Sequence, residues 1–198
     1  MITFSAQIIS ILFHPAIISI ATPIILIFFI KREVPYSAFW VLYPLLFVGI
    51  VIVFTYLGVR TKLFSDFDVT KRQERKPLYL FVILISVLYI TLLFIFGGPK
   101  SLMILGVGVL IGAIVFELVN KKLKASIHVA AVSAFMCVLA LLYGGIFLLL
   151  PLLIPVIAWS RIHMKRHTFS EALVGGSVGI GLTVAIYLVV EYIIYLYG

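Results

Sequence analysis

Residues 127–159 decide the fold, and they read IHVAAVSAFMCVLALLYGGIFLLLPLLIPVIAW. As one helix this stretch would extend about 50 Å, well beyond the ~30 Å hydrocarbon core of a bilayer. A Tyr-Gly-Gly sequence at 143–145 is a favourable turn, and the two prolines that follow it oppose one straight helix. The sequence therefore predicts a hairpin of two short helices, 127–142 and 146–159, in place of one long helix.

The hairpin is surrounded by longer apolar segments, and each of them has the ~20 residues that a spanning helix needs. They lie at 6–30, 38–59, 78–97, 101–119 and 171–197. The whole chain is 64% hydrophobic and 11% charged, whereas soluble domains are about half apolar and about one quarter charged. We therefore predict an all-α, polytopic membrane helical bundle with about six to seven transmembrane helices, forming one integral membrane domain over 1–198. Residues 6–30 are predicted to be one retained helix.

The hairpin also determines which polar segments share a face of the membrane. With it, the connectors after the second, fourth and sixth spans lie on one side; with a single long helix, the last connector would lie on the other. All lysines and arginines except Lys31, Arg32 and Lys100 then fall on the connector face. By the positive-inside rule this face is predicted to be cytoplasmic.

The net charge of +8 comes from basic residues in short connectors between apolar runs. This placement favours lipid headgroups or phosphate substrates as partners, and it disfavours nucleic acid. The single cysteine, Cys137, lies within an apolar run and is predicted to be a packing residue.

The third connector carries the most specific pattern, Ser160-Arg161 followed by His167 and Glu171. His167 and Glu171 are four residues apart at the start of a helix, so they share a face. A carboxylate there can accept the imidazole Nδ1–H and leave Nε2 free to attack. A helix N-terminus and Arg161 would favour an anionic phosphoryl group. The alternative without catalysis is a surface His–Glu pair in a basic loop.

The other two connectors add polar residues that suit the same chemistry. Ser126 and His128 stand at the entry to a helix, where a hydroxyl and backbone N–H groups can bind phosphate oxygens and an imidazole can donate a proton. Taken alone, Ser126 would be an ordinary N-cap and His128 an interfacial histidine. Arg72 and Arg75 could clamp a phosphate, or simply flank a membrane helix.

Together the three connectors resemble the motifs of the type 2 phosphatidic acid phosphatase superfamily, which is related to the vanadium haloperoxidases. The spacing from Ser160-Arg161 to His167 and Glu171 is that of the third family motif, with Glu in place of Asp. Ala125-Ser126-Ile127-His128 keeps the Ser and His of the second motif. Arg72, Arg75 and Pro77 look like a variant of the first, with Val69 where the family has Lys. Phe13-His14-Pro15 also looks like small bacterial members.

The resemblance covers about residues 60–185 and implies a phosphatase-like core in that range. It implies a lipid phosphate phosphatase that hydrolyses a phosphate monoester or diphosphate, phosphatidate-like or polyprenyl, without a metal or other cofactor. By resemblance, His167 forms a phospho-histidine, Glu171 orients it, and His128 is the acid and then the base. The residues implied to bind the phosphoryl group are Arg72, Arg75, Ser126 and Arg161.

Two other functions stay open on the sequence. A phospho-histidine can transfer its group to an alcohol, which would make the protein a lipid phosphotransferase. The first and second motifs also differ from the family pattern, and these differences fit a non-catalytic lipid-phosphate binder or transporter. In every case we expect an integral membrane protein, and the resemblance implies a bacterial or archaeal cell membrane.

Overall fold

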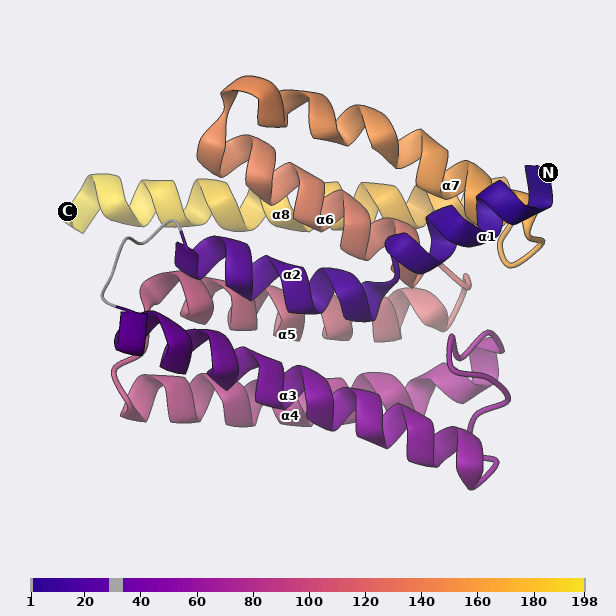
Figure 1. The fold of residues 1–198 in the computed structure, drawn as a ribbon, viewed down its shortest axis with the longest axis horizontal. Helices are drawn as coiled ribbons and strands as arrows, with labels where there is room; N and C mark the ends of the chain where they lie inside the picture. Colours follow the sequence, from indigo (N-terminus) through magenta and orange to yellow (C-terminus); the bar gives the residue numbers. More distant parts are fainter. Residues whose placement is uncertain (1, 29–33, 198) are drawn as a thin grey trace. The chain divides into compact units, whose positions relative to one another are not determined.

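The chain folds into helices alone over the residues that the computed structural model describes, 2–28 and 34–197 (Figure 1). In chain order the helices are α1 (Ile2–Leu12), α2 (Pro15–Phe28), α3 (Val34–Arg60), η1 (Arg72–Glu74), α4 (Arg75–Ile95), α5 (Lys100–Asn120), α6 (Ile127–Tyr143), η2 (Gly145–Leu153), α7 (Ile154–His163) and α8 (Phe169–Tyr197). Lys31 and Arg32, which entered the charge argument, lie outside the described residues.

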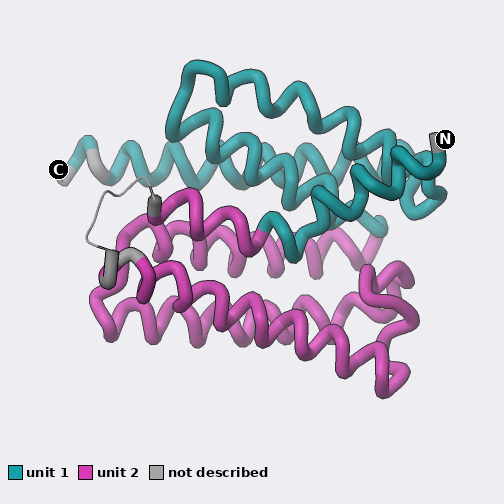
Figure 2. Tube along the Cα trace, in the orientation of Figure 1, with its two compact units in different colours: residues 1–18, 123–198 teal, residues 19–122 magenta. Residues whose placement is uncertain are grey.

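The chain divides into two compact units (Figure 2). Unit 1 contains residues 1–18 and 123–198, and unit 2 contains residues 19–122. The connectors that follow the second, fourth and sixth predicted spans are thus distributed over both units. The single domain over 1–198 and the phosphatase-like core over 60–185 stay predictions.

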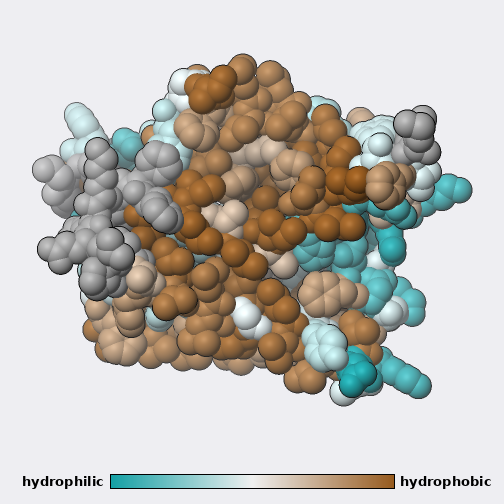
Figure 3. Space-filling model, in the orientation of Figure 1, coloured by the Kyte–Doolittle hydropathy of each residue, from teal (hydrophilic) through white to brown (hydrophobic). Residues whose placement is uncertain are grey.

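The helices have the length and composition of membrane spans, which confirms the predicted class. Among the described residues five are long and apolar enough to cross a bilayer, and the bent pair α1–α2 makes a sixth if it counts as one span. Many large apolar side chains are exposed on these helices, and hydrophobic residues cover much of the face drawn in Figure 3. Such a surface suits lipid and is costly in water. The protein is an integral membrane protein.

The predicted hairpin is confirmed. α6 ends at Tyr143, and the chain reverses through Gly144 and Gly145, whose φ angles are +59° and +53°. Only glycine adopts this left-handed region without a steric cost, which explains the pair at the turn. η2 and α7 then return beside α6 (Figure 1).

The second arm of the hairpin is longer than predicted. The helical run continues from Gly145 to His163, 19 residues, and is long enough to span. We predicted its end at Trp159 because polar residues follow. Ser160 and Arg161 remain helical because both are buried and their side chains have partners on α1, as described below.

The prediction of one helix over 6–30 was wrong. Two helices, α1 and α2, meet at a bend of 42° around His14. Pro15 has no N–H to continue the hydrogen-bond ladder, and it disfavours helical geometry at the preceding residue. His14 then caps α2, since its Nδ1 accepts the Ala16 N–H at 3.2 Å.

Unit 1 is held by close packing of α6 on α8 and of α7 on α1. A Cβ added to Gly175 would lie 2.5 Å from the Ser126 carbonyl oxygen, and one added to Gly179 would lie 2.4 Å from that of Ala130. Only glycine permits this approach of two backbones, as is common between membrane helices. The apolar core around this contact includes Val132, Met136, Ile157 and their neighbours.

Unit 2 packs α4 between α3 and α5 around an aromatic cluster. The rings of Trp40, Tyr43, Phe47 and Tyr89 contact one another, mostly edge-on or tilted. The buried Tyr43 hydroxyl donates to the Tyr89 carbonyl at 2.6 Å, which satisfies its polar atom within an apolar core.

Candidate functional site

The connector between α7 and α8 folds back on the end of α7. The Arg161 carbonyl accepts the N–H groups of Arg166 at 3.1 Å and of His167 at 3.3 Å. Lys165 makes this turn possible with a φ angle of +56°, in the left-handed region. The turn returns His167 to Arg161, the second residue of the third motif.

His167 and Glu171 form a hydrogen-bonded pair. Nδ1 of His167 lies 2.9 Å from Oε2 of Glu171, and the imidazole is 3% exposed against 15% for the carboxylate. An ionised carboxylate only accepts, so in neutral His167 the proton is on Nδ1 and the lone pair is on Nε2. The arrangement predicted from the four-residue spacing is therefore present.

Glu171 also caps α8. Its Oε2 accepts the Thr168 N–H at 3.1 Å, and its own N–H donates to Thr168 Oγ1 at 3.3 Å. This reciprocal arrangement is a capping box, which the sequence Thr168-Phe-Ser-Glu171 could have indicated. The carboxylate thus has one bond that fixes it to the helix and one that fixes the imidazole.

Ser126 joins the second connector to the third. Its backbone N–H donates to the Glu171 carbonyl at 3.0 Å, while its hydroxyl accepts the Val129 N–H at 3.4 Å as the N-cap of α6. Ser126 is fully buried, and Gly175 lies against its carbonyl. The ordinary N-cap role that was the alternative for Ser126 is therefore observed, beside a main-chain link between the two connectors.

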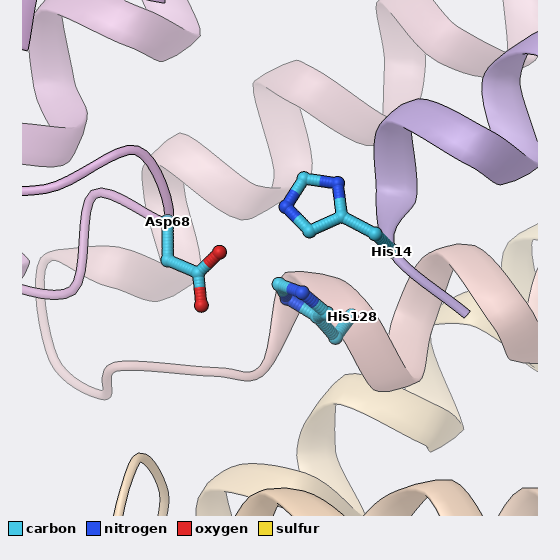
Figure 4. Close-up of side chains that lie close together, drawn as sticks. All are labelled: His14, Asp68 and His128. Carbon is cyan, nitrogen blue, oxygen red and sulfur yellow. The ribbon is translucent and has the colours of Figure 1, made fainter. Parts of the chain in front are cut away.

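His128 is the second residue of α6 and is buried. Its ring meets that of His14 edge to face, with the ring centroids 4.8 Å apart and the planes at 90° (Figure 4). Asp68, which the same view draws, belongs to unit 2. The contact was not predicted, because His14 was placed within one unbroken helix over 6–30.

Arg161 is buried, and its Nη1 donates to the Ser10 hydroxyl at 2.6 Å. The preceding Ser160 hydroxyl donates to the Ala6 carbonyl, also at 2.6 Å. Both bonds tie the end of α7 to α1. Ala6 and Ser10 lie in an apolar run that carries no chemical pattern, so the sequence could not indicate their role.

Lys124 is a member of this site that our site prediction did not include. Its Nζ donates to the Arg166 carbonyl at 2.9 Å and lies 4.0 Å from Glu171 Oε2. Lys124 stands in the second connector, two residues before Ser126, so the sequence placed it among the polar residues without marking it.

Arg72 and Arg75 lie in unit 2, where each bonds to main-chain carbonyls. Arg72 donates through Nη1 to Lys122 at 3.1 Å and through Nη2 to Lys121, at the end of α5. Asn120 Nδ2 returns a bond to the Arg72 carbonyl at 3.0 Å. Arg75 is buried and donates through Nε to the Val69 carbonyl at 3.0 Å. Within unit 2 both arginines hold the connector to helix ends.

No known protein family, no curated protein and no solved structure matches this chain. The resemblance to the type 2 phosphatidic acid phosphatase superfamily stays a hypothesis that rests on the connector motifs.

Proposed function

We propose that the protein is a metal-independent lipid phosphate phosphatase that works through a phospho-histidine. The observation that supports this most directly is the 2.9 Å contact between His167 Nδ1 and Glu171 Oε2, which leaves the lone pair on Nε2. The motif spacing from Ser160 to Glu171 and the main-chain bond from Ser126 to Glu171 support it further.

In the first proposed step, the lone pair of His167 Nε2 attacks phosphorus. The P–N bond forms, the P–O bond to the leaving group breaks, and His128 gives its proton to the leaving oxygen. In the second step His128 takes a proton from water, the water oxygen attacks phosphorus, and the P–N bond breaks to release phosphate. Glu171 holds His167 in the required tautomer throughout.

Positive charge offsets the phosphoryl group in this proposal. Arg161 and Ser126 of unit 1 are its proposed contacts, together with Arg72 and Arg75 of unit 2. A guanidinium has five N–H donors, so a bond to a main-chain carbonyl does not by itself prevent contact with a phosphoryl oxygen. Phosphoryl transfer is mainly positioning and charge stabilisation, which arginines can supply.

The proposed substrate is a lipid phosphate or diphosphate, phosphatidate-like or polyprenyl. The third connector follows a helical run long enough to span and precedes another such helix. A ligand that reaches a connector of this kind from the bilayer has its tail among apolar helices and its phosphate at the helix ends.

The test is phosphate release by the detergent-purified protein on phosphatidate and on a polyprenyl diphosphate, with EDTA present. We expect activity in the wild type and a loss of at least about 10³-fold in His167→Ala, as for the loss of a catalytic nucleophile. His163→Ala is the matched control, because His163 is exposed and stacks on Trp159 at a ring-centroid distance of 5.3 Å. Equal losses in both variants, or no release by the wild type, would refute the proposal.

A phosphotransferase would form the same intermediate, and an added acceptor alcohol separates the two reactions. Hydrolysis yields free phosphate, whereas transfer yields a new phosphoester.

A bell-shaped dependence of rate on pH is expected if the two histidines have opposite roles. A flat profile between about pH 5 and 9 would argue against His128 as the acid.

A non-catalytic lipid-phosphate binder is favoured by two specific observations. Glu171 completes a capping box and Arg161 bonds to Ser10, so both residues have structural roles without any chemistry. This alternative expects lipid-phosphate binding that survives His167→Ala, with no turnover by the wild type.

A further inference from the structure

The carboxylate of Glu171 has contacts beyond those that orient the proposed nucleophile. Three nitrogens approach its Oε2: His167 Nδ1 at 2.9 Å, the Thr168 backbone nitrogen at 3.1 Å and Lys124 Nζ at 4.0 Å. Of these, only the lysine carries a full positive charge whatever the protonation state of the histidine.

Lys124 is held in this position by a hydrogen bond. Its Nζ donates to the Arg166 carbonyl at 2.9 Å, in the same connector as His167. The lysine side chain is 22% exposed and the glutamate 15%, so water screens their attraction only in part. The bond to Arg166 explains why the ammonium stays beside the carboxylate.

We infer that Lys124 is a positioning residue that balances the charge of the His167–Glu171 pair and thereby keeps His167 in its neutral, nucleophilic form. A lone carboxylate beside an imidazole favours the imidazolium, which cannot attack phosphorus. A lysine beside the same carboxylate oxygen opposes that effect. This inference rests on the proposed function for its catalytic meaning, while the charge balance itself is independent of turnover.

Several charged or titratable groups belong to the elements around His167. They are Lys124 before α6, His128 on α6, Arg161 on α7, His14 before α2, Lys165 and Arg166 in the connector, and Glu171 on α8. Among these, Glu171 has a contact with the His167 ring and Lys124 has a contact with Glu171. The guanidinium of Arg161 donates to the Ser10 hydroxyl, and its positive charge is present in all variants below.

The experiment follows the four histidine rings by NMR in detergent-solubilised full-length protein with ¹³C-labelled histidine. His167→Ala identifies the His167 signal. In Lys124→Met the titration midpoint of His167 is expected to move to higher pH, by roughly half to one pH unit, because an opposing positive charge is lost. Lys124→Gln, a second neutral variant, is expected to do the same, and Lys124→Arg is expected to restore the wild-type midpoint.

Lys122→Met is the matched control, since Lys122 is exposed and the substitution retains its backbone, whose N–H donates to Val119 and whose carbonyl accepts from Arg72. It is expected to leave the midpoint unchanged. The acidic limb of the rate profile for phosphate release should follow the NMR midpoint in each variant, at unchanged KM.

An unchanged midpoint in both neutral variants would overturn the inference, whatever the activity. A shifted midpoint in a protein that releases no phosphate would uphold the charge balance and refute the proposed function. A loss of rate without any shift of the acidic limb would show a purely structural role for Lys124, and would also overturn the inference.

Discussion

Two connectors contain similar residues but differ in what those residues contact. One joins α7 to α8 in unit 1, and the other joins α3 to α4 in unit 2. Both are basic, both contain residues with a positive φ angle, and both hold a glutamate at the helix entry. In unit 1 Glu171 contacts a buried imidazole. In unit 2 Glu74 accepts the N–H of Ser65 at 2.6 Å and also the Ser65 hydroxyl, and it pairs with Lys71 at 3.2 Å.

The comparison shows that charge and a carboxylate do not by themselves indicate chemistry. The partners of Glu74, Ser65 and Lys71, are exposed residues of the same connector. The contacts of Glu74 therefore stabilise a surface loop. The imidazole beside Glu171 is buried, and an imidazole is a side chain that can act as a nucleophile. The partner of the carboxylate, and its burial, distinguish a candidate site from a folded loop.

Substitution of the two glutamates should give the largest difference. Glu171→Gln keeps a side chain that can cap α8 but can present the wrong tautomer of His167, so we expect kcat to fall by about 10²- to 10⁴-fold. Glu74→Gln is expected to change kcat by less than about twofold, since Glu74 contacts Ser65 and Lys71 and neither residue has a part in the proposed chemistry. The measurement is steady-state phosphate release, with melting curves for both. Similar rates in the two variants would reduce Glu171 to a helix cap.

The packing behind the unit 1 connector should give the next largest effect. Gly175→Ala places a Cβ against the main-chain carbonyl of Ser126, so α6 and α8 must separate, at a cost of about 1–3 kcal/mol. Gly181→Ala, six residues along α8, meets nothing within 4 Å and is expected to stabilise by about 0.5–1 kcal/mol. Denaturation in detergent compares them. A stable Gly175→Ala protein would mean that the two helices are less closely packed.

The arginines of the unit 2 connector provide a smaller and sharper test. Arg72→Met removes one proposed phosphate contact, and we expect kcat/KM to fall by about tenfold, the size of one charged hydrogen bond. Arg60→Met is the control, because Arg60 is exposed and lies over the Tyr56 ring at 5.7 Å. If Arg72→Met lowers only the Tm, Arg72 is solely a cap for the end of α5 and unit 2 contributes no such contact.

The smallest expected effect is at Ser126. Ser126→Ala removes the N-cap acceptor and should cost about 0.5–2 kcal/mol of stability. The backbone N–H that bonds to Glu171 is retained, so the link between the two connectors persists. Activity is expected to fall by less than about tenfold, which is the loss of one neutral hydrogen bond. An unchanged rate would remove the hydroxyl from the proposed contacts of the phosphoryl group.

The helices and their order were predictable because their signals are local. Apolar runs, the glycine pair after Tyr143 and the spacing of His167 and Glu171 depend on neighbouring residues, and the structure confirms all three. The bend at Pro15 was also readable, since a proline that follows His14 disfavours helical geometry there. The length of the apolar run 6–30 predicted one helix, whereas the proline after His14 decides the local geometry.

The rest depended on contacts across the sequence. Ser160 and Arg161 extend a helix because Ala6 and Ser10 supply partners for them, and neither partner differs in type from its apolar or small neighbours. Lys124 approaches Glu171 only because the connectors meet through Ser126. Contacts of this kind join residues that are distant in the sequence, so they can be identified only once the fold is known.

The division of unit 1 into residues 1–18 and 123–198 has a consequence for biosynthesis. Ala6 and Ser10 meet Ser160 and Arg161, which are 154 and 151 residues later in the chain. A ribosome completes all of unit 2 before it makes the partners of α1, and contacts between residues so distant form slowly. A nascent chain arrested before Ser160 would therefore contain every residue of unit 2. In that chain α1 would lack its partners on α7, and unit 1 would be incomplete.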